Sequence, residues 1–179
     1  MRIVIAVAFA ISLTACNGQS ATIDPATPSG TAETTGAAAP APETGAKMAD
    51  SAAWAKHVPW NNDAAEVQKT GSGVEYVVLA SGPADGVPPA SSQDAEVYYE
   101  GRLNAGGPAF DSAFERNRTE TFPVAAVVPG FSEALQLMKP GDRWLVYIPS
   151  DLGYGARGAG RDIPPNSDLV FEIEMVGVH

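Results

Sequence analysis

The sequence is poor in the side chains that carry most metal and redox chemistry. Its 179 residues include one cysteine, Cys16, and two histidines, His57 and His179, which lie far apart along the chain. A single cysteine cannot form an intramolecular disulfide, and two isolated histidines have no neighbouring ligands with which to bind a metal. The composition therefore predicts neither a disulfide framework nor a metal site, and no cofactor.

Basic residues are also scarce. The chain has 11 Lys and Arg against 21 Asp and Glu, which gives a formal net charge of −10. Proteins that bind nucleic acid carry basic patches, so this balance excludes nucleic acid as a partner. The glycine-rich stretch from Gly155 to Gly160 lacks the G-x-G-x-x-G spacing of a dinucleotide site, and we find no nucleophile motif.

No apolar run is long enough to span a bilayer, which takes about 20 residues. The run from Ile3 to Leu13 follows a basic start and ends in Leu13-Thr14-Ala15-Cys16, a pattern typical of a secretory signal that also resembles the bacterial lipobox. We predict a lipoprotein signal peptide over residues 1–16, lipidation of Cys16 and attachment to a membrane in the bacterial cell envelope. Asn17 favours the outer membrane, facing the periplasm. An ordinary signal peptide with a free thiol is the alternative.

Residues 17–50 are almost all Ala, Thr, Pro, Gly, Ser, Asp and Glu. Such a segment cannot bury enough apolar surface to offset its chain entropy, so we predict a disordered tether.

Residues 51–70 form a short N-terminal extension that carries Trp54 and Trp60. The stretch from Ala52 to Lys56 tolerates a helix, Pro59 should end it, and residues 63–69 could add one or two further turns. Two tryptophans in so short a segment predict packing, either onto the domain or onto a second copy of the chain.

The remaining residues, 71–179, suffice for one domain with one core. Period-two apolar patterns predict strands around Val74–Val78, Val97–Leu103, Trp144–Ile148 and Leu169–Met175. Phe131, Leu135 and Met138 form one apolar stripe, which predicts a single helix from Ser132 to Lys139. We therefore predict an α+β fold in which an antiparallel sheet packs on one short α-helix.

Six short segments occur in an order that resembles the FKBP family of peptidyl-prolyl cis–trans isomerases. They are Val97-Tyr98-Tyr99-Glu100-Gly101, Phe110-Asp111-Ser112, Val128-Pro129-Gly130-Phe131, Leu152-Gly153-Tyr154-Gly155, Ile163-Pro164-Pro165 and Leu169-Val170-Phe171. The resemblance implies a strongly twisted antiparallel β-sheet wrapped around the helix, with a proline pocket between them. It also implies isomerisation of peptide bonds before proline, in unfolded proline-containing polypeptides, with macrolide ligands as further candidates.

Carried over position by position, the resemblance implies catalytic roles for Tyr99, Asp111, Tyr154 and Phe171. It implies substrate binding by Phe110, Val127, Val128, Phe131 and Ile163, and an ion pair between Arg116 and Asp111. Phe131 replaces the tryptophan that is usual in the family, and Glu120 stands at a wall position that can be aromatic. These two departures concern affinity and macrolide binding more than fold.

The residues also have structural interpretations. Periodicity alone favours Tyr99, Phe131 and Phe171 as core, whereas Tyr154 lies between glycines in a loop and favours a site. Two other functions therefore stay open: a module that binds proline-containing chains without catalysis, and a structural lipoprotein whose pocket is idle.

Overall fold

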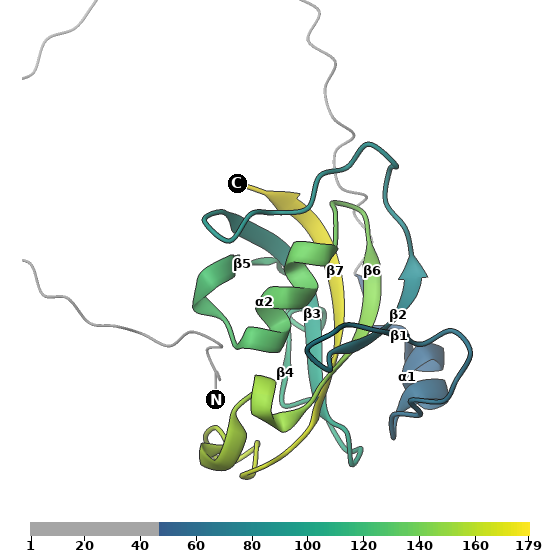
Figure 1. Cartoon of the computed structure of the whole chain (residues 1–179), viewed down its shortest axis with the longest axis vertical. Helices are drawn as coiled ribbons and strands as arrows, with labels where there is room; N and C mark the ends of the chain where they lie inside the picture. The colour runs from purple at the N-terminus through teal and green to yellow at the C-terminus, as the bar shows by residue number, and fades with distance from the viewer. Residues whose placement is uncertain (1–46) are drawn as a thin grey trace, which may run out of the picture. The chain divides into compact units, whose positions relative to one another are not determined.

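A computed structural model of the protein describes residues 47–179. The predicted signal peptide, Cys16 and most of the predicted tether lie outside the described residues. The elements in chain order (Figure 1) are α1 (Ser51–His57), β1 (Gln68–Lys69), β2 (Glu75–Ala80), β3 (Asp94–Leu103), β4 (Asp111–Ser112), β5 (Glu120–Pro123), η1 (Val124–Ala126), α2 (Pro129–Leu137), β6 (Arg143–Ile148), η2 (Ser150–Leu152), η3 (Gly155–Arg157) and β7 (Leu169–Val178). The three η elements are short 3-10 turns.

The strands form one antiparallel sheet, as the fold class predicts. Its order is β1-β2-β6-β7-β3-β4, and β5 also pairs with β3. Strand β3 thus has two partners along the same edge, because residues 94–97 face β5 and residues 100–101 face β4. The central pairing of β3 with β7 extends from Ala95↔Val178 to Leu103↔Leu169. Strands β3 and β7 thus form the centre of the sheet, and β4, which carries Asp111, is held at its edge by β3.

Helix α2 packs on one face of this sheet, which curves around it (Figure 1). It begins at Pro129 and ends at Leu137, so the predicted range from Ser132 to Lys139 was shifted toward the C-terminus. Proline is well suited to the first helical turn, where its missing N–H costs nothing. Pro140 disfavours a helical residue before it, which ends the helix early. A Cβ atom on Gly130 would lie 2.5 Å from Ile148 Cγ2, so glycine allows α2 to approach β6 closely.

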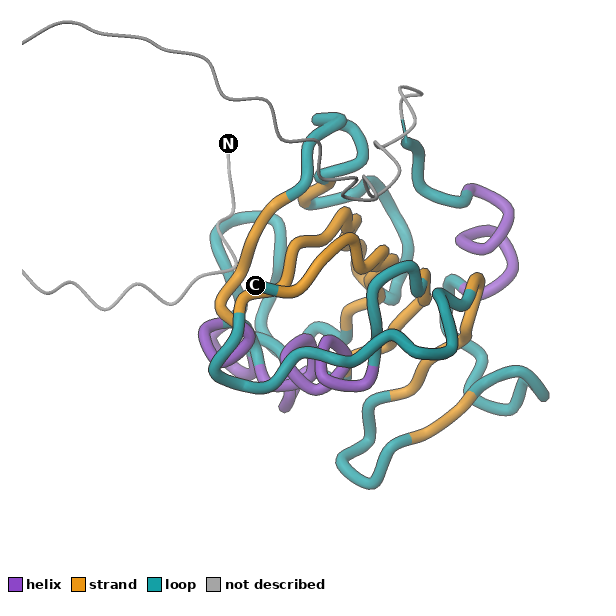
Figure 2. Tube along the Cα trace, turned by 90° about the horizontal axis from the view of Figure 1, so that it is seen from above, coloured by secondary structure: helices purple, strands orange, loops and turns teal. Residues whose placement is uncertain are grey.

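Alternating residues of β6 and β7 face two different apolar clusters. Val146, Ile148, Phe171 and Ile173 join the main core beneath α2, together with the predicted helix stripe. The opposite face carries the smaller cluster of Trp54, Leu145 and Val170. The sheet is therefore covered on both faces, and Figure 2 shows α1 and α2 on opposite sides of it.

The face of the sheet opposite α2 is covered by the N-terminal arm, defined here as residues 47–60. Helix α1 is capped by the Asp50 carboxylate, which accepts from the N–H groups of Ala52 and Ala53 at 3.0 and 3.1 Å. Trp54 is 3% exposed and packs against the chain's own sheet, as the first of the two packing alternatives predicts. The predicted turns over residues 63–69 are replaced by a loop and β1, because Gln68 and Lys69 pair with β2.

The first residues of the arm are also fixed to the sheet, although we predicted a tether as far as residue 50. The buried carboxylate of Glu172 accepts from the Asp50 N–H at 2.8 Å and from Arg143 Nε at 2.6 Å, and Lys47 pairs with Glu174. Burial raises the pKa of Glu172 despite the neighbouring Arg143. Residues 47–50 offer little apolar surface, so these polar contacts hold them on the sheet instead.

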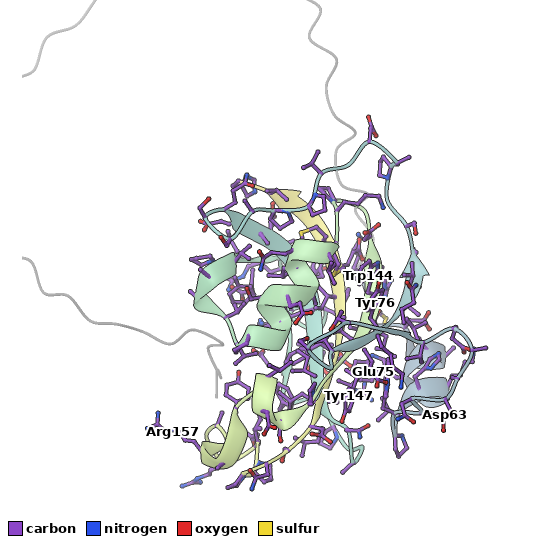
Figure 3. All side chains as sticks on the ribbon, viewed as in Figure 1. Asp63, Glu75, Tyr76, Trp144, Tyr147 and Arg157 are labelled. Carbon is purple, nitrogen blue, oxygen red and sulfur yellow. The ribbon has the colours of Figure 1, made fainter. Side chains whose placement is uncertain are left out.

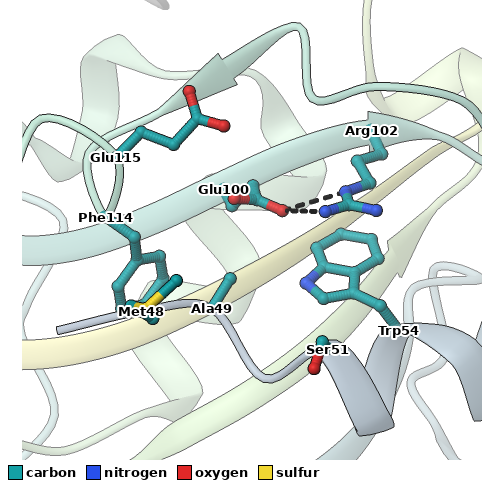
Figure 4. Close-up of a pocket in the computed structure, with 8 residues that line it drawn as sticks. All are labelled: Met48, Ala49, Ser51, Trp54, Glu100, Arg102, Phe114 and Glu115. Carbon is teal, nitrogen blue, oxygen red and sulfur yellow. Dashed lines mark hydrogen bonds and ion pairs between the residues drawn. The ribbon is translucent and has the colours of Figure 1, made fainter.

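A pocket of about 210 Å³ lies between the arm and this face of the sheet (Figure 4). In it the guanidinium of Arg102 stacks over the Trp54 ring at 4.6 Å and pairs with Glu100. The charged pair is thus satisfied within the protein, and the pocket is the gap left where the arm crosses the strands.

Candidate functional site

Aromatic rings from five separate segments meet between α2 and the sheet. The ring centroid of Phe131 lies 5.1 Å from that of Phe171 and 6.3 Å from those of Tyr99 and Phe122. Phe110 continues the series at 5.6 Å from Phe171. All these pairs are edge-to-face, a geometry that aromatic quadrupoles favour. Phe131 and Phe171 are fully buried and form the floor, whereas Phe110 is half-buried at the edge.

Gly101 lets these rings approach β3. A Cβ atom at this position would lie 2.5 Å from the Phe110 ring and 2.6 Å from the Phe171 ring. Any side chain here would displace both rings. Sequence reasoning included Gly101 in a motif but assigned it no role, and it did not assign Phe122 to the site. The alternation of β5, which buries Phe122 and exposes its neighbours, was the available signal for the latter.

A polar network borders the rings. The Tyr99 hydroxyl donates to Asp111 Oδ2 at 2.5 Å, and Arg116 Nη1 donates to Asp111 Oδ1 at 2.5 Å. Arg116 Nη2 also lies 3.3 Å from the Tyr99 hydroxyl and 3.5 Å from Glu120 Oε1. Burial first, and then the bond to Asp111, raise the pKa of Tyr99. The predicted pairing of Arg116 with Asp111 is present.

Tyr154 approaches the same network from the loop between β6 and β7. Its hydroxyl oxygen is buried and has no hydrogen-bond partner among the described residues. Burial, and secondarily the charge of Asp111, raise its pKa to about 12, so the hydroxyl remains a proton donor at neutral pH. A buried hydroxyl without a partner is costly in a fold and is suited to donate to a ligand carbonyl.

The remaining candidates surround the rings. Ile163 is 2% exposed, and its segment is fixed by paired backbone bonds with Ala159 of 2.8 and 3.1 Å. Val127 and Val128 are buried between η1 and α2. Eight of the candidate residues belong to the main core cluster or pack against it, and the ninth, Asp111, is bonded to Tyr99. The structure thus brings all nine together.

Glu120, the predicted wall residue, faces charge rather than a ring. It pairs with Arg118 at 3.0 Å as well as with Arg116. Its carboxylate therefore belongs to the outer end of the network around Asp111.

The following statements concern residues 47–179, the part of the chain that the structure describes. In this range no group of three or more His, Cys, Asp or Glu side chains is arranged to hold a metal ion. None of the helices described is both long and apolar enough to cross a membrane.

Comparison with known proteins places these residues in a family context. Residues 86–176 match the family model described as FKBP-type peptidyl-prolyl cis-trans isomerase. The chain is 42% identical over 123 residues to the FKBP-type 22 kDa peptidyl-prolyl cis-trans isomerase of Escherichia coli, covering 69% of this chain and 58% of that protein. It is 41% identical over 107 residues to the outer membrane protein MIP of Legionella longbeachae, covering 60% of this chain and 45% of that protein.

A solved structure agrees with these matches. The crystal structure of a peptidyl-prolyl cis-trans isomerase from Pseudomonas syringae pv. tomato aligns with a TM-score of 0.60 and 37% identity, covering 65% of this chain and 84% of that one. The chain spans only about half the length of the two curated relatives described above.

Proposed function

Because the chain belongs to the FKBP-type peptidyl-prolyl cis–trans isomerase family, we propose that it catalyses isomerisation of the peptide bond before proline in unfolded polypeptides. The observation that carries the proposal is the buried hydroxyl of Tyr154, which has no partner among the described residues, in a side chain that packs on the core of the ring floor and feels the charge of Asp111. The proposed catalytic residues are Tyr99, Asp111, Tyr154 and Phe171.

The chemistry follows from the nature of the bond. Resonance holds the peptide bond planar, with a barrier of about 18–20 kcal/mol to rotation. Twisting the bond removes the resonance and with it the charge separation, so the twisted amide is less polar than the planar one. A site lined with apolar rings disfavours the planar form relative to the twisted one and is complementary to the transition state. A thousandfold acceleration needs only about 4 kcal/mol of such preference.

The polar groups would orient the chain. We assign the Tyr154 hydroxyl to a substrate carbonyl, and Phe110, Val127, Val128, Phe131 and Ile163 to the walls around the pyrrolidine ring. Arg116 would act as a positioning residue, because it holds the Asp111 carboxylate on the Tyr99 hydroxyl. No covalent intermediate is required, since rotation about one bond is the whole reaction.

An exchange measurement tests the proposal. The full chain is added to an alanyl-proline peptide, and cis–trans exchange is followed by NMR or by a protease-coupled assay. Exchange much faster than in buffer supports the proposal, and exchange at the buffer rate contradicts it. The same titration reports binding separately from turnover.

Binding without catalysis is the second candidate function. The observation that favours it is Phe131, a phenyl ring where the family usually has an indole, so that the floor offers less ring surface. Peptide-induced shifts at the nine residues without faster exchange would establish this alternative. Macrolide ligands would contact the same rings, with affinity reduced by Phe131 and by the charge of Glu120. Inhibition of exchange by a macrolide would measure that affinity.

We also propose that the protein is a lipoprotein of the bacterial envelope, held through an acylated Cys16 in the outer membrane and facing the periplasm. The support is the Leu13-Thr14-Ala15-Cys16 sequence, together with the outer-membrane protein among the relatives. Mass spectrometry of the membrane fraction should find diacylglyceryl modification of Cys16, and Cys16→Ser should release the protein from the membrane. An unmodified, soluble wild-type chain would contradict the anchor and leave the isomerase proposal intact.

A further inference from the structure

The loop between β6 and β7 carries two arginines beside the candidate site. Arg157 ends η3, which follows Tyr154 directly, and Arg161 lies two residues before Ile163. Both arginines are exposed. Figure 3 shows Arg157 projecting away from the body of the protein at this loop. The segment that supplies two of the nine candidate residues therefore also carries two positive charges on its outer surface.

These arginines are exceptional within residues 47–179. Every other Lys and Arg in that range forms an ion pair with an Asp or Glu: Lys47, Lys56, Lys69, Arg102, Arg116, Arg118, Lys139 and Arg143. Arg157 and Arg161 pair with no carboxylate there, and this includes Asp151 and Asp162 of the same loop, which are exposed. In a chain of net charge −10, two free cations at one loop are available to an anion from another molecule.

The backbone that carries the two arginines is hydrogen-bonded within the loop. Ala159 and Ile163 exchange two backbone hydrogen bonds, and the Asn166 N–H donates to the Gly155 carbonyl at 2.8 Å. These bonds link the ends of the loop to each other. The backbone of both arginines therefore belongs to the same hydrogen-bonded loop as Tyr154 and Ile163, within reach of a chain bound near those two residues.

We propose that Arg157 and Arg161 select substrates with acidic residues close to the proline. The inference rests on the proposed isomerase function and specifies its substrate class. A planar guanidinium donates two parallel hydrogen bonds to a carboxylate, which gives arginine a preference for this partner. Exposed ion pairs are weak, so we expect each arginine that pairs with the substrate to raise kcat/KM by about two- to fivefold.

Matched peptides test this inference. Their sequences are identical except for Glu, Gln or Lys at one of the two positions before or after an alanyl-proline unit. At low salt we expect kcat/KM for the best Glu peptide to exceed that of its Gln counterpart by roughly two- to tenfold. The ratio should approach one at about 1 M salt, where the screening length is about 3 Å.

Variants assign the effect to the loop. In Arg157→Gln/Arg161→Gln the Glu-to-Gln ratio should fall to about one, and Arg157→Glu/Arg161→Glu should favour the Lys peptide. The matched control is Lys56→Gln, which removes an exposed charge from α1 on the other side of the sheet and should keep the wild-type ratio.

The outcomes separate the inference from the function on which it rests. Equal acceleration of Glu and Gln peptides by the wild-type chain overturns the selection of acidic substrates and leaves the isomerase proposal standing. If no peptide is accelerated, the isomerase proposal fails, and the dissociation constants of the same peptides decide the role of the arginines. Arginine-dependent binding to phosphatidylglycerol vesicles without peptide preference would assign the loop to lipid and overturn the inference.

Discussion

The Tyr99 hydroxyl and the Asp111 carboxylate join two neighbouring antiparallel strands through a hydrogen bond of 2.5 Å between Oη and Oδ2. Arg116 contacts both groups, so each has a second partner on the same side chain. Because the pKa of Tyr99 is raised by burial and by this bond, the hydroxyl keeps its proton and stays a donor at neutral pH. The network thus has one stable arrangement of charges.

Removing the charge of Asp111 should weaken this arrangement. We expect Asp111→Asn to lower kcat/KM by roughly ten- to a hundredfold, since a hydrogen bond to a charged group contributes about 1.5–3 kcal/mol. The exchange assay on a neutral alanyl-proline peptide measures the change. Glu115→Gln, which alters an exposed carboxylate four residues away, is the control. Full activity in a stably folded Asp111→Asn protein would remove Asp111 from the site.

Tyr154 offers a test in which stability and activity should separate. Its hydroxyl has no partner among the described residues, so Tyr154→Phe should leave the melting temperature unchanged or slightly raised. The loss of one hydrogen bond to the substrate should lower kcat/KM by about two- to tenfold. Tyr147→Phe is the matched control, because that hydroxyl bonds Asp168 at 2.9 Å. It should cost about 1 kcal/mol of stability and little activity. A less stable Tyr154→Phe protein would argue for a structural hydroxyl.

Truncation should affect Phe171, in the ring floor, differently from Phe110, at the rim (the half-buried edge of the rings). Phe171 is fully buried, so Phe171→Ala should lower the free energy of unfolding by about 3–5 kcal/mol. Phe110 is half-buried, so Phe110→Ala should cost less than that and should act mainly by raising KM. Urea denaturation and steady-state kinetics of both variants provide the comparison. Equal losses of stability would contradict the assignment of Phe110 to the rim.

The arm should make stability depend on pH. His57 is buried, and burial, followed by the charge of Lys56, lowers its pKa below the ordinary value of 6.5, while Glu66 opposes the shift. The unfolded chain therefore binds a proton more readily than the folded one, and the free energy of unfolding should fall as pH drops below about 6.5. Urea denaturation at about pH 7.5 and 5.5 measures this fall. It should be smaller in His57→Gln, and an equal fall in that variant would show that other groups cause it.

The sequence predicted the strands and the helix well where one face is buried. Alternation in β3 and β7 and the stripe of Phe131, Leu135 and Met138 follow directly from periods of 2 and 3.6. The start of α2 was misplaced because Pro129 was taken as a boundary rather than as the first helical residue. The two-residue strand β1 carries no periodic signal, since its existence depends on a partner in β2.

The site required more than periodicity. Burial patterns alone assign Tyr99 and Phe171 to the core, and both are indeed buried. Their grouping with Asp111 and Tyr154 came from the order of short motifs that resembles a family. Contacts such as Lys47 with Glu174 or Asp50 with Glu172 join residues more than 120 positions apart and have no local signature.

The N-terminal arm packs on the face of the sheet opposite α2. Its first residue, Lys47, lies over the Tyr98 ring at 5.5 Å and pairs with Glu174. The arm therefore does not cover the rings of Phe131 and Phe171, which lie under α2 on the other face. A polypeptide that binds beside Tyr154, as we propose, would therefore not have to displace the arm.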